Sequence, residues 1–210
     1  MRCPLCDHQP CHLHMQIKDR RYHRCPRCLL TFLDPALHLS PERERAHYDL
    51  HDNNPADPRY RAFLDRLAIP LIAKLTPGER GLDYGCGPGP ALAQMLSERG
   101  FPTAVYDPIY AADQAVLSDQ YDFVSCSEVV EHMHRPAEEF ARLAQLVRPG
   151  GWLGVMTGLL TDDIDFRRWH YRRDPTHICF YHPDTFKQLP ISHHWQLTEI
   201  IGNAILLQRH

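Results

Sequence analysis

The 210-residue sequence contains no uninterrupted run of about 18 apolar residues, the length that a membrane-spanning helix needs. It also has no signal-like apolar stretch at its N-terminus, no internal repeat and no low-complexity tract. Apolar residues make up 43% of the chain, and the formal net charge is −3. These properties predict a globular, cytoplasmic protein without a membrane partner.

Two common phosphate-binding motifs are absent as well, since the chain has neither G-x-G-x-x-G nor a G-K-[ST] cradle. It has instead a segment at residues 82–90 in which an apolar strand end leads into Asp83 and then into three glycines at alternate positions. Glycine lets the backbone turn sharply and approach a ligand where any Cβ would clash. We therefore predict a nucleotide-binding turn here, followed by a helix that begins near Ala91.

The acid-x-G-x-G-x-G pattern led by Asp83 resembles the first motif of class I S-adenosylmethionine-dependent methyltransferases. Three later segments resemble further elements of that family in the same order: a strand ending in Asp107, the fourth strand and its loop at 121–132, and a helix end, turn and fifth strand at 146–156. The resemblance covers about residues 76–158 and implies the enzyme class without the substrate. It implies an α/β fold with a Rossmann-like sheet of seven strands, mostly parallel with one antiparallel edge strand.

The resemblance also indicates which residues bind the cofactor. Asp107 falls 20 residues after Gly87, near the interval of roughly 20 residues at which such folds place a carboxylate on the ribose hydroxyls. Taken alone, Asp107-Pro108 would indicate a plain turn. By the resemblance, S-adenosylmethionine and its product S-adenosylhomocysteine are bound by ten residues: Asp83, Gly85, Cys86, Gly87, Pro88, Gly89, Asp107, Pro108, Ser127 and Glu128. Cys86 is expected to serve only as a small residue of the turn.

Apolar periodicity places helices and strands around these motifs. Helices are expected at residues 41–50, 58–71, 91–99 and 137–147, and strands at 152–156, 195–201 and 204–208. Strands that alternate with helices predict a parallel sheet with crossover helices. The last two strands are expected to form a closing hairpin that supplies the antiparallel edge.

Two C-x2-C pairs, Cys3 with Cys6 and Cys25 with Cys28, are separated by 18 residues near the N-terminus. This spacing predicts a zinc ribbon whose four thiolates leave no open coordination position, so the zinc is expected to be structural. Disulfides are disfavoured because the cofactor motif favours a reducing cytosol. Other nearby candidates, which we do not expect to bind zinc, are Cys11, His8, His12, His14 and His23. We divide the chain into a ribbon (1–34), a linker (35–57) and a methyltransferase domain (58–210).

Residues 162–182 mix aromatic side chains with histidine, arginine and aspartate directly after the predicted fifth strand. We predict that an acceptor lid spans about residues 159–186. Its Asp174-Pro-Thr-His177 resembles an Asp-x-x-His segment of related methyltransferases. His177, oriented by Asp174, is expected to take or relay the acceptor's proton. His132, Tyr171 and Tyr181 are expected to shape the pocket. The alternative for His177 is a purely structural role in pinning the lid, and for Glu131-His132 a helix-start carboxylate beside a surface histidine.

Three function classes follow. The leading hypothesis is methyl transfer to the oxygen, sulfur or carbon of a small molecule, with a thiol as one option. The second is an RNA methyltransferase, because some ribosomal RNA guanine methyltransferases carry an N-terminal four-cysteine ribbon. Residues 1–28 carry a formal charge of only +4, about +2 with zinc bound, which is little for phosphate binding. The third is a non-catalytic zinc-ribbon interaction protein. The oligomeric state is not predicted.

Overall fold

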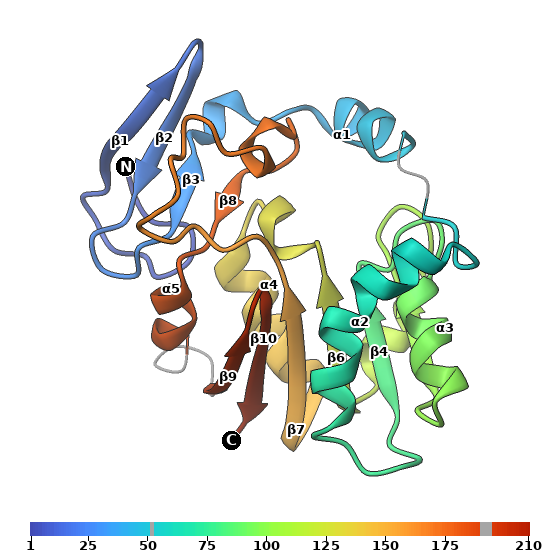
Figure 1. Cartoon of the computed structure of the whole chain (residues 1–210). Coiled ribbons are helices and arrows are strands. Elements are labelled where there is room, and N and C mark those ends of the chain that lie inside the picture. Colours follow the sequence, from blue (N-terminus) through green and yellow to red (C-terminus); the bar gives the residue numbers. More distant parts are fainter. Residues whose placement is uncertain (51–52, 190–194) are drawn as a thin grey trace.

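Two β-sheets organise the chain (Figure 1). The computed structural model describes residues 1–50, 53–189 and 195–210, so residues 51–52 of the predicted linker lie outside the description. The larger sheet has the strand order β5-β4-β6-β7-β10-β9. Its strands are β4 (Gly81–Tyr84), β5 (Thr103–Tyr106), β6 (Tyr121–Ser127), β7 (Val147–Met156), β9 (Trp195–Ile201) and β10 (Ala204–Arg209).

The strands β5, β4, β6 and β7 are parallel, which confirms the Rossmann-like α/β prediction. The described residues contribute six strands to this sheet where seven were expected, and the stretch between β5 and β6 contains a 3₁₀ helix, η2 (Gln114–Ser118). The closing hairpin is present. However, β10 pairs antiparallel with both β7 and β9, so the antiparallel strand lies inside the sheet and β9 forms the edge. Burial explains this order, because residues 204–207 of β10 are all buried whereas in β9 only Trp195 is buried.

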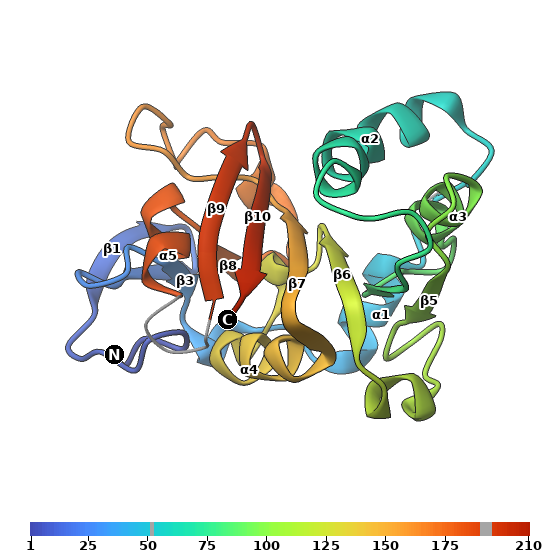
Figure 2. The same ribbon diagram turned by 90° about the horizontal axis from the view of Figure 1, so that it is seen from below.

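Helices cover both faces of the larger sheet (Figure 2). On one face, α2 (Pro58–Ile72) and α3 (Ala91–Glu98) bury apolar side chains such as Leu67 and Met95 against Phe123. On the other face, α4 (Pro136–Leu146) buries Phe140 and Leu143. These helices match the predicted ranges within a few residues. The sheet is therefore buried on both sides, as a parallel sheet requires.

The smaller sheet joins the predicted ribbon to the predicted lid. Its order is β1 (His12–Ile17), β2 (Arg20–Arg24), β3 (Thr31–Leu33) and β8 (Cys179–Phe180). Strand β8 belongs to the lid, and Thr31 pairs with Phe180. Tyr22 of β2 packs edge-on against both Phe166 and Phe180. The ribbon of residues 1–34 therefore shares a sheet and a core with the lid, although the predicted boundary treats them as separate.

Short elements complete the fold. They are η1 (Pro35–Leu37), α1 (Pro41–Tyr48), η3 (Val130–His132), η4 (Tyr171–Arg173) and α5 (Pro183–Gln188). In the part of the chain that the structure describes, no helix has the length and apolar character that crossing a membrane requires.

Candidate functional site

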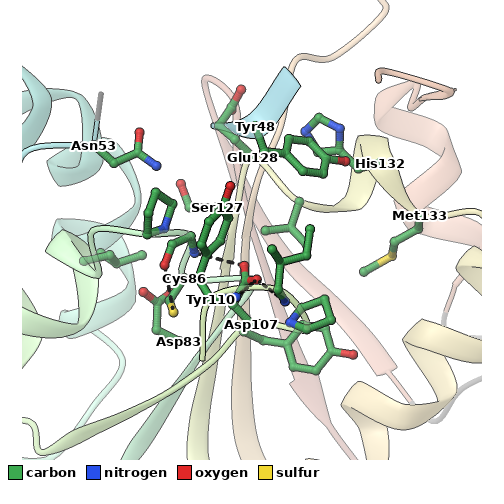
Figure 3. A pocket seen from close by; sticks show the side chains of 18 of the residues that line it. Tyr48, Asn53, Asp83, Cys86, Asp107, Tyr110, Ser127, Glu128, His132 and Met133 are labelled. Carbon is green, nitrogen blue, oxygen red and sulfur yellow. Dashed lines mark hydrogen bonds between the residues drawn. The ribbon is translucent and has the colours of Figure 1, made fainter. Parts of the chain in front are cut away.

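A cavity of about 810 Å³ lies beyond the carboxyl ends of β4, β5 and β6 (Figure 3). All ten predicted cofactor residues line it, as do four of the five predicted catalytic residues: His132, Tyr171, Asp174 and His177. Ligands bind in this position in open α/β sheets because the loops after adjacent strands converge there. The structure thus brings together sequence motifs that lie up to about 90 residues apart.

The glycine loop after β4 is as tightly packed as its sequence suggests. Gly85 has φ +79°, and a Cβ there would lie 2.5 Å from a methyl carbon of Val129. A Cβ on Gly89 would lie 2.1 Å from the carbonyl oxygen of Asn53. Only glycine fits at these two positions, so the loop can pass close beneath the cavity.

The Asp107 carboxylate organises the loops around it. One oxygen accepts the Gly87 N–H at 3.0 Å, and the other accepts the N–H groups of Ile109 at 2.8 Å and Tyr110 at 3.0 Å. A carboxylate offers about four acceptor positions, so these three bonds leave capacity for one further donor such as a ribose hydroxyl. Asp107 therefore holds the glycine loop in place in addition to its expected role.

Two polar groups at the base of the cavity suit a charged ligand. Asp83 is buried, accepts a hydrogen bond from the Ser125 hydroxyl at 2.8 Å, and has a pKa raised to about 6 because burial disfavours its charged form. The hydroxyl of Ser127 is buried without a hydrogen-bond partner among the described residues. A bound ammonium group and a further polar group would satisfy both, so these residues fit S-adenosylmethionine.

On the lid side, His132 and His177 lie together, with ring centroids 4.7 Å apart. Nδ1 of His177 lies 2.7 Å from the Tyr171 carbonyl oxygen, and Nδ1 of His132 lies 3.2 Å from that of Thr176. Nε2 of His177 is 3.9 Å from the Asp174 carboxylate. Asp174 makes closer contacts with the Thr176 N–H at 2.8 Å and with His47 at 3.2 Å. The Tyr171 carbonyl, more than Asp174, therefore sets the orientation of the His177 ring.

Behind these histidines lies a buried polar cluster that the sequence does not reveal. The Tyr171 hydroxyl contacts the Glu131 carboxylate, Glu128 at 3.1 Å and the Thr157 hydroxyl at 3.1 Å. Glu131 is fully buried, and burial raises its pKa far above the usual value. Burial also raises the pKa of Glu128 to about 7. For Glu131 the sequence left two alternatives, a helix-start carboxylate and an active-site role, and Thr157 falls in no motif.

The structure places Tyr181 away from the predicted pocket. Its side chain is fully buried, its hydroxyl donates to the Val130 carbonyl at 3.0 Å, and its ring stacks on Phe186. The expectation that Tyr181 shapes the acceptor pocket is wrong, because the chain turns this residue into the core behind η3. It supports the loop that carries His132.

Sequence reasoning missed several cavity residues, among them Tyr48, Asn53 and Tyr110. Tyr48 of α1 packs edge-on against His132 with ring centroids 5.3 Å apart, and Asn53 lies over the glycine loop. The Tyr110 hydroxyl donates to Asp49 at 2.6 Å. The segment first interpreted as a linker therefore forms part of the cavity wall. Tyr48, the only Phe, Trp or Tyr in residues 35–57, was the available signal.

In the ribbon, the sulfur atoms of Cys3, Cys6, Cys25 and Cys28 all lie within 4.8 Å of one another. Cys3 and Cys28 are 3.6 Å apart, and Cys6 and Cys25 are 3.5 Å apart. A zinc tetrahedron with Zn–S bonds of about 2.3 Å has edges of about 3.8 Å, so the four residues fit zinc. Cys11 lies outside this group and contacts the His8 carbonyl instead.

The two cysteine turns have the same backbone geometry. The N–H of Asp7 donates to the Cys3 carbonyl at 3.2 Å, and that of Leu29 donates to the Cys25 carbonyl at 3.0 Å. Asp7 and Leu29 each follow the second cysteine of a pair and have φ of 60° and 62°. Such an uncommon conformation, repeated in two non-glycine residues, indicates two equivalent ligand-bearing turns.

Comparisons with known proteins agree with this site. A family model for a methyltransferase domain matches residues 53–192, more than half of the chain. The ubiquinone biosynthesis O-methyltransferase of Burkholderia multivorans is 34% identical over 132 residues, covering 51% of this chain and 53% of that protein. The corresponding enzyme of Aeromonas salmonicida is 33% identical over 104 residues, covering 38% and 43%. The chain thus spans about half the length of the curated relatives it matches.

Among solved structures, 1,6-didemethyltoxoflavin-N1-methyltransferase of Burkholderia thailandensis, with bound 1,6-didemethyltoxoflavin and S-adenosylhomocysteine, is similar with a TM-score of 0.56. It is 16% identical, and the match covers 94% of this chain and 97% of that one. At this identity the likeness shows the fold alone. The family match and the cavity together confirm the predicted class: the chain belongs to the methyltransferase domain family.

Proposed function

We propose that the chain transfers a methyl group from S-adenosylmethionine to a small-molecule nucleophile. The observation that carries the proposal is the single cavity of about 810 Å³ in which the glycine loop and Asp107 face His132 and His177. The names of the relatives, O-methyltransferases of ubiquinone biosynthesis, favour an oxygen acceptor. The RNA alternative has less support, because the ribbon carries little positive charge.

When bound, the cofactor supplies an electrophilic methyl carbon on a sulfonium sulfur. The chain's own residues hold it: we assign its ammonium group to Asp83, its ribose to Asp107 and its closest backbone approach to Gly85, Gly87 and Gly89. Cys86, Pro88, Pro108, Ser127 and Glu128 complete the wall. Methyl transfer is an in-line displacement, so positioning and exclusion of water are the main tasks of these residues.

His177 is our candidate for the group that takes or relays the acceptor's proton. A carbonyl oxygen only accepts hydrogen bonds, so the contact of Nδ1 with Tyr171 places the proton of the neutral ring on Nδ1. Nε2 then carries the lone pair that accepts a proton. Tyr171 and His132 position the acceptor, and Asp174 stabilises the segment through Thr176.

The four cysteines form the second part of the proposal. We assign them a structural zinc ion that stabilises residues 1–34, a segment too short to fold on a core of its own. Because β3 pairs with β8, the ribbon would support the lid as well as itself.

Calorimetric titration of S-adenosylmethionine and S-adenosylhomocysteine into zinc-loaded protein tests the cofactor site. Micromolar binding that is lost in Asp107→Ala and kept in the exposed Asp119→Ala is the expected result. A turnover screen with phenols, thiols, carboxylates and total RNA then separates the acceptor classes. Methylation of RNA alone would replace the small-molecule proposal, and absence of cofactor binding by folded protein would leave only the interaction-protein alternative.

The role of His177 needs its own variant. His177→Gln is expected to lower turnover by roughly 10²- to 10⁴-fold and to flatten the pH profile of the remaining activity. Unchanged turnover across pH would assign His177 to the structural alternative of pinning the lid.

A further inference from the structure

Three potential metal ligands converge beside the cofactor cavity. The Glu131 carboxylate and the rings of His132 and His177 each place one donor atom within 4.8 Å of the other two. They come from η3 and from the lid segment after η4, which lie far apart in the sequence. Glu131 is fully buried, whereas both histidines line the cavity. A buried acid facing two histidines differs from the exposed acidic groups that commonly cluster without a ligand.

Both imidazoles have the hydrogen bond that metal-binding histidines usually make. Nδ1 of His132 contacts the Thr176 carbonyl at 3.2 Å, and Nδ1 of His177 contacts the Tyr171 carbonyl at 2.7 Å. Carbonyl oxygens only accept, so each neutral ring carries its proton on Nδ1 and its lone pair on Nε2. Histidines that bind metals almost always donate their other N–H to a carbonyl or carboxylate, which fixes the ring orientation.

Hydrogen bonds fix η3, which carries Glu131 and His132, relative to the lid segment that carries His177. The Ile178 N–H donates to the Glu131 carbonyl at 2.9 Å, and the Cys179 thiol contacts the Met133 carbonyl at 3.4 Å. The contact between His132 and the Thr176 carbonyl adds a third link between η3 and the lid. A site assembled from two segments therefore has a rigid frame, as selective binding requires.

Glu131 shares the Tyr171 hydroxyl with a second buried acid, Glu128. Among the described residues, no lysine or arginine forms an ion pair with Glu128 or Glu131. The Tyr171 hydroxyl has one proton to donate and contacts Glu128, Glu131 and Thr157. The Thr157 hydroxyl donates to Glu131 as well, at 3.0 Å. A positive ion bound beside the two buried acids would favour their ionised form, which burial otherwise disfavours.

We propose that Glu131, His132 and His177 bind a divalent first-row transition-metal ion, separate from the four-cysteine zinc site. Two imidazoles and one carboxylate form a donor set that suits manganese, iron, cobalt or zinc and leaves coordination positions open on the cavity side. An oxygen of the methyl acceptor is the ligand for these positions, and in this respect alone the inference rests on the proposed function. With the ion bound, the lone pair of His177 is occupied, so His177 accepts a proton only in the metal-free protein.

Manganese titration of the zinc-loaded protein, followed by electron paramagnetic resonance, tests this site. Manganese prefers oxygen and imidazole ligands, whereas thiolates select softer ions, so the ribbon keeps its zinc. We expect one manganese ion per chain, with binding at least about tenfold weaker in His132→Gln and His177→Gln. The matched control is His134→Gln, which removes a neighbouring histidine that pairs with Glu44 and belongs to no ligand set. Circular dichroism and zinc content verify that each variant is folded.

Two results would overturn the site. One is the absence of a second ion, with manganese, cobalt or zinc as the probe, in folded protein whose ribbon zinc is intact. The other is equal manganese affinity in the wild type and in both glutamine variants. These measurements need neither methyl donor nor acceptor. The metal site can therefore be disproved while cofactor binding and turnover are observed, and it can be confirmed when they are not.

Discussion

Asp83 is a buried carboxyl group whose ionisation is linked to both folding and cofactor binding. Burial raises its pKa from 3.8 to about 6. The folded-state pKa lies above the unfolded value, so the protonated form stabilises the fold. Without cofactor, the contribution of Asp83 to the free energy of unfolding therefore falls as the pH rises from about 4 to about 6.

Cofactor affinity should show the opposite dependence, because an ammonium group prefers the ionised carboxylate. We expect the dissociation constant of S-adenosylhomocysteine to fall roughly tenfold from pH 5 to pH 7, because the ionised fraction of Asp83 rises over this range. Calorimetry at several pH values measures this change. Asp83→Asn should bind weakly with a flat profile, and the exposed Asp119→Asn should retain the wild-type slope. A flat wild-type profile would mean that Asp83 does not contact the cofactor's charge.

Replacing Gly85 and Gly78 by alanine should destabilise the fold for different reasons. At Gly78 only the backbone conformation is unfavourable, whereas at Gly85 the added Cβ also overlaps a neighbouring side chain. Both have positive φ, +79° and +91°, but a Cβ at Gly78 meets no atom within 4 Å, whereas one at Gly85 overlaps Val129. Gly78→Ala should lower the free energy of unfolding by about 1–2 kcal/mol, and Gly85→Ala should cost a further 1–3 kcal/mol or so. Urea denaturation measures both. Equal losses would indicate that Val129 moves aside freely.

At the scale of elements, α1 is the least anchored helix of the cavity wall. It buries no residue. Besides the Tyr48 ring against His132, polar contacts hold α1 and the residue after it: Glu44 with His134 at 2.7 Å, His47 with Asp174 at 3.2 Å, and Asp49 with Tyr110 at 2.6 Å. Helices without buried apolar contacts open easily. We expect its amides to exchange with deuterium much faster than those of α2, and bound cofactor to slow them. Equal protection of α1 and α2 in the free protein would contradict this.

The elements also show what local sequence can and cannot predict. Strand β4, the glycine turn and α3 follow from patterns within about 20 residues, and all three lie as expected. Strand β8 has two residues and gains its identity only by pairing with β3, so no local pattern marks it. The order of β9 and β10 in the sheet depends likewise on burial against β7.

The same limit applies to the site. The motif residues of the cofactor cavity were predicted because their roles depend on nearby backbone. Tyr171 and Tyr181 both lie in the predicted lid, yet one lines the cavity and the other is buried behind η3. The contacts of Glu131 with Tyr171 and Thr157 exist only in the folded chain, so the sequence could not decide between a helix-start carboxylate and an active-site residue.

At the scale of the whole molecule, removal of zinc from the ribbon should also disturb the structure of the lid, because the two share a sheet. Trp169 reports on the lid, since its ring lies 5.9 Å from Phe180 and 5.1 Å from Tyr171. We expect a zinc chelator to lower the melting temperature and to shift the tryptophan emission of the wild type, with little shift in Trp169→Phe. An unchanged emission spectrum after measured zinc loss would show that the lid keeps its structure without the zinc-bound ribbon.

The pairing of Thr31 with Phe180 has a consequence for biosynthesis. Residues 1–34 are synthesised well before β8, the strand that completes their sheet. Until then the edge of β3 has no partner and is open to pairing with other chains. We therefore expect nascent chains that stop before residue 179 to aggregate or to bind chaperones through their N-terminal segment. Early zinc capture by the four cysteines would protect that segment while translation continues.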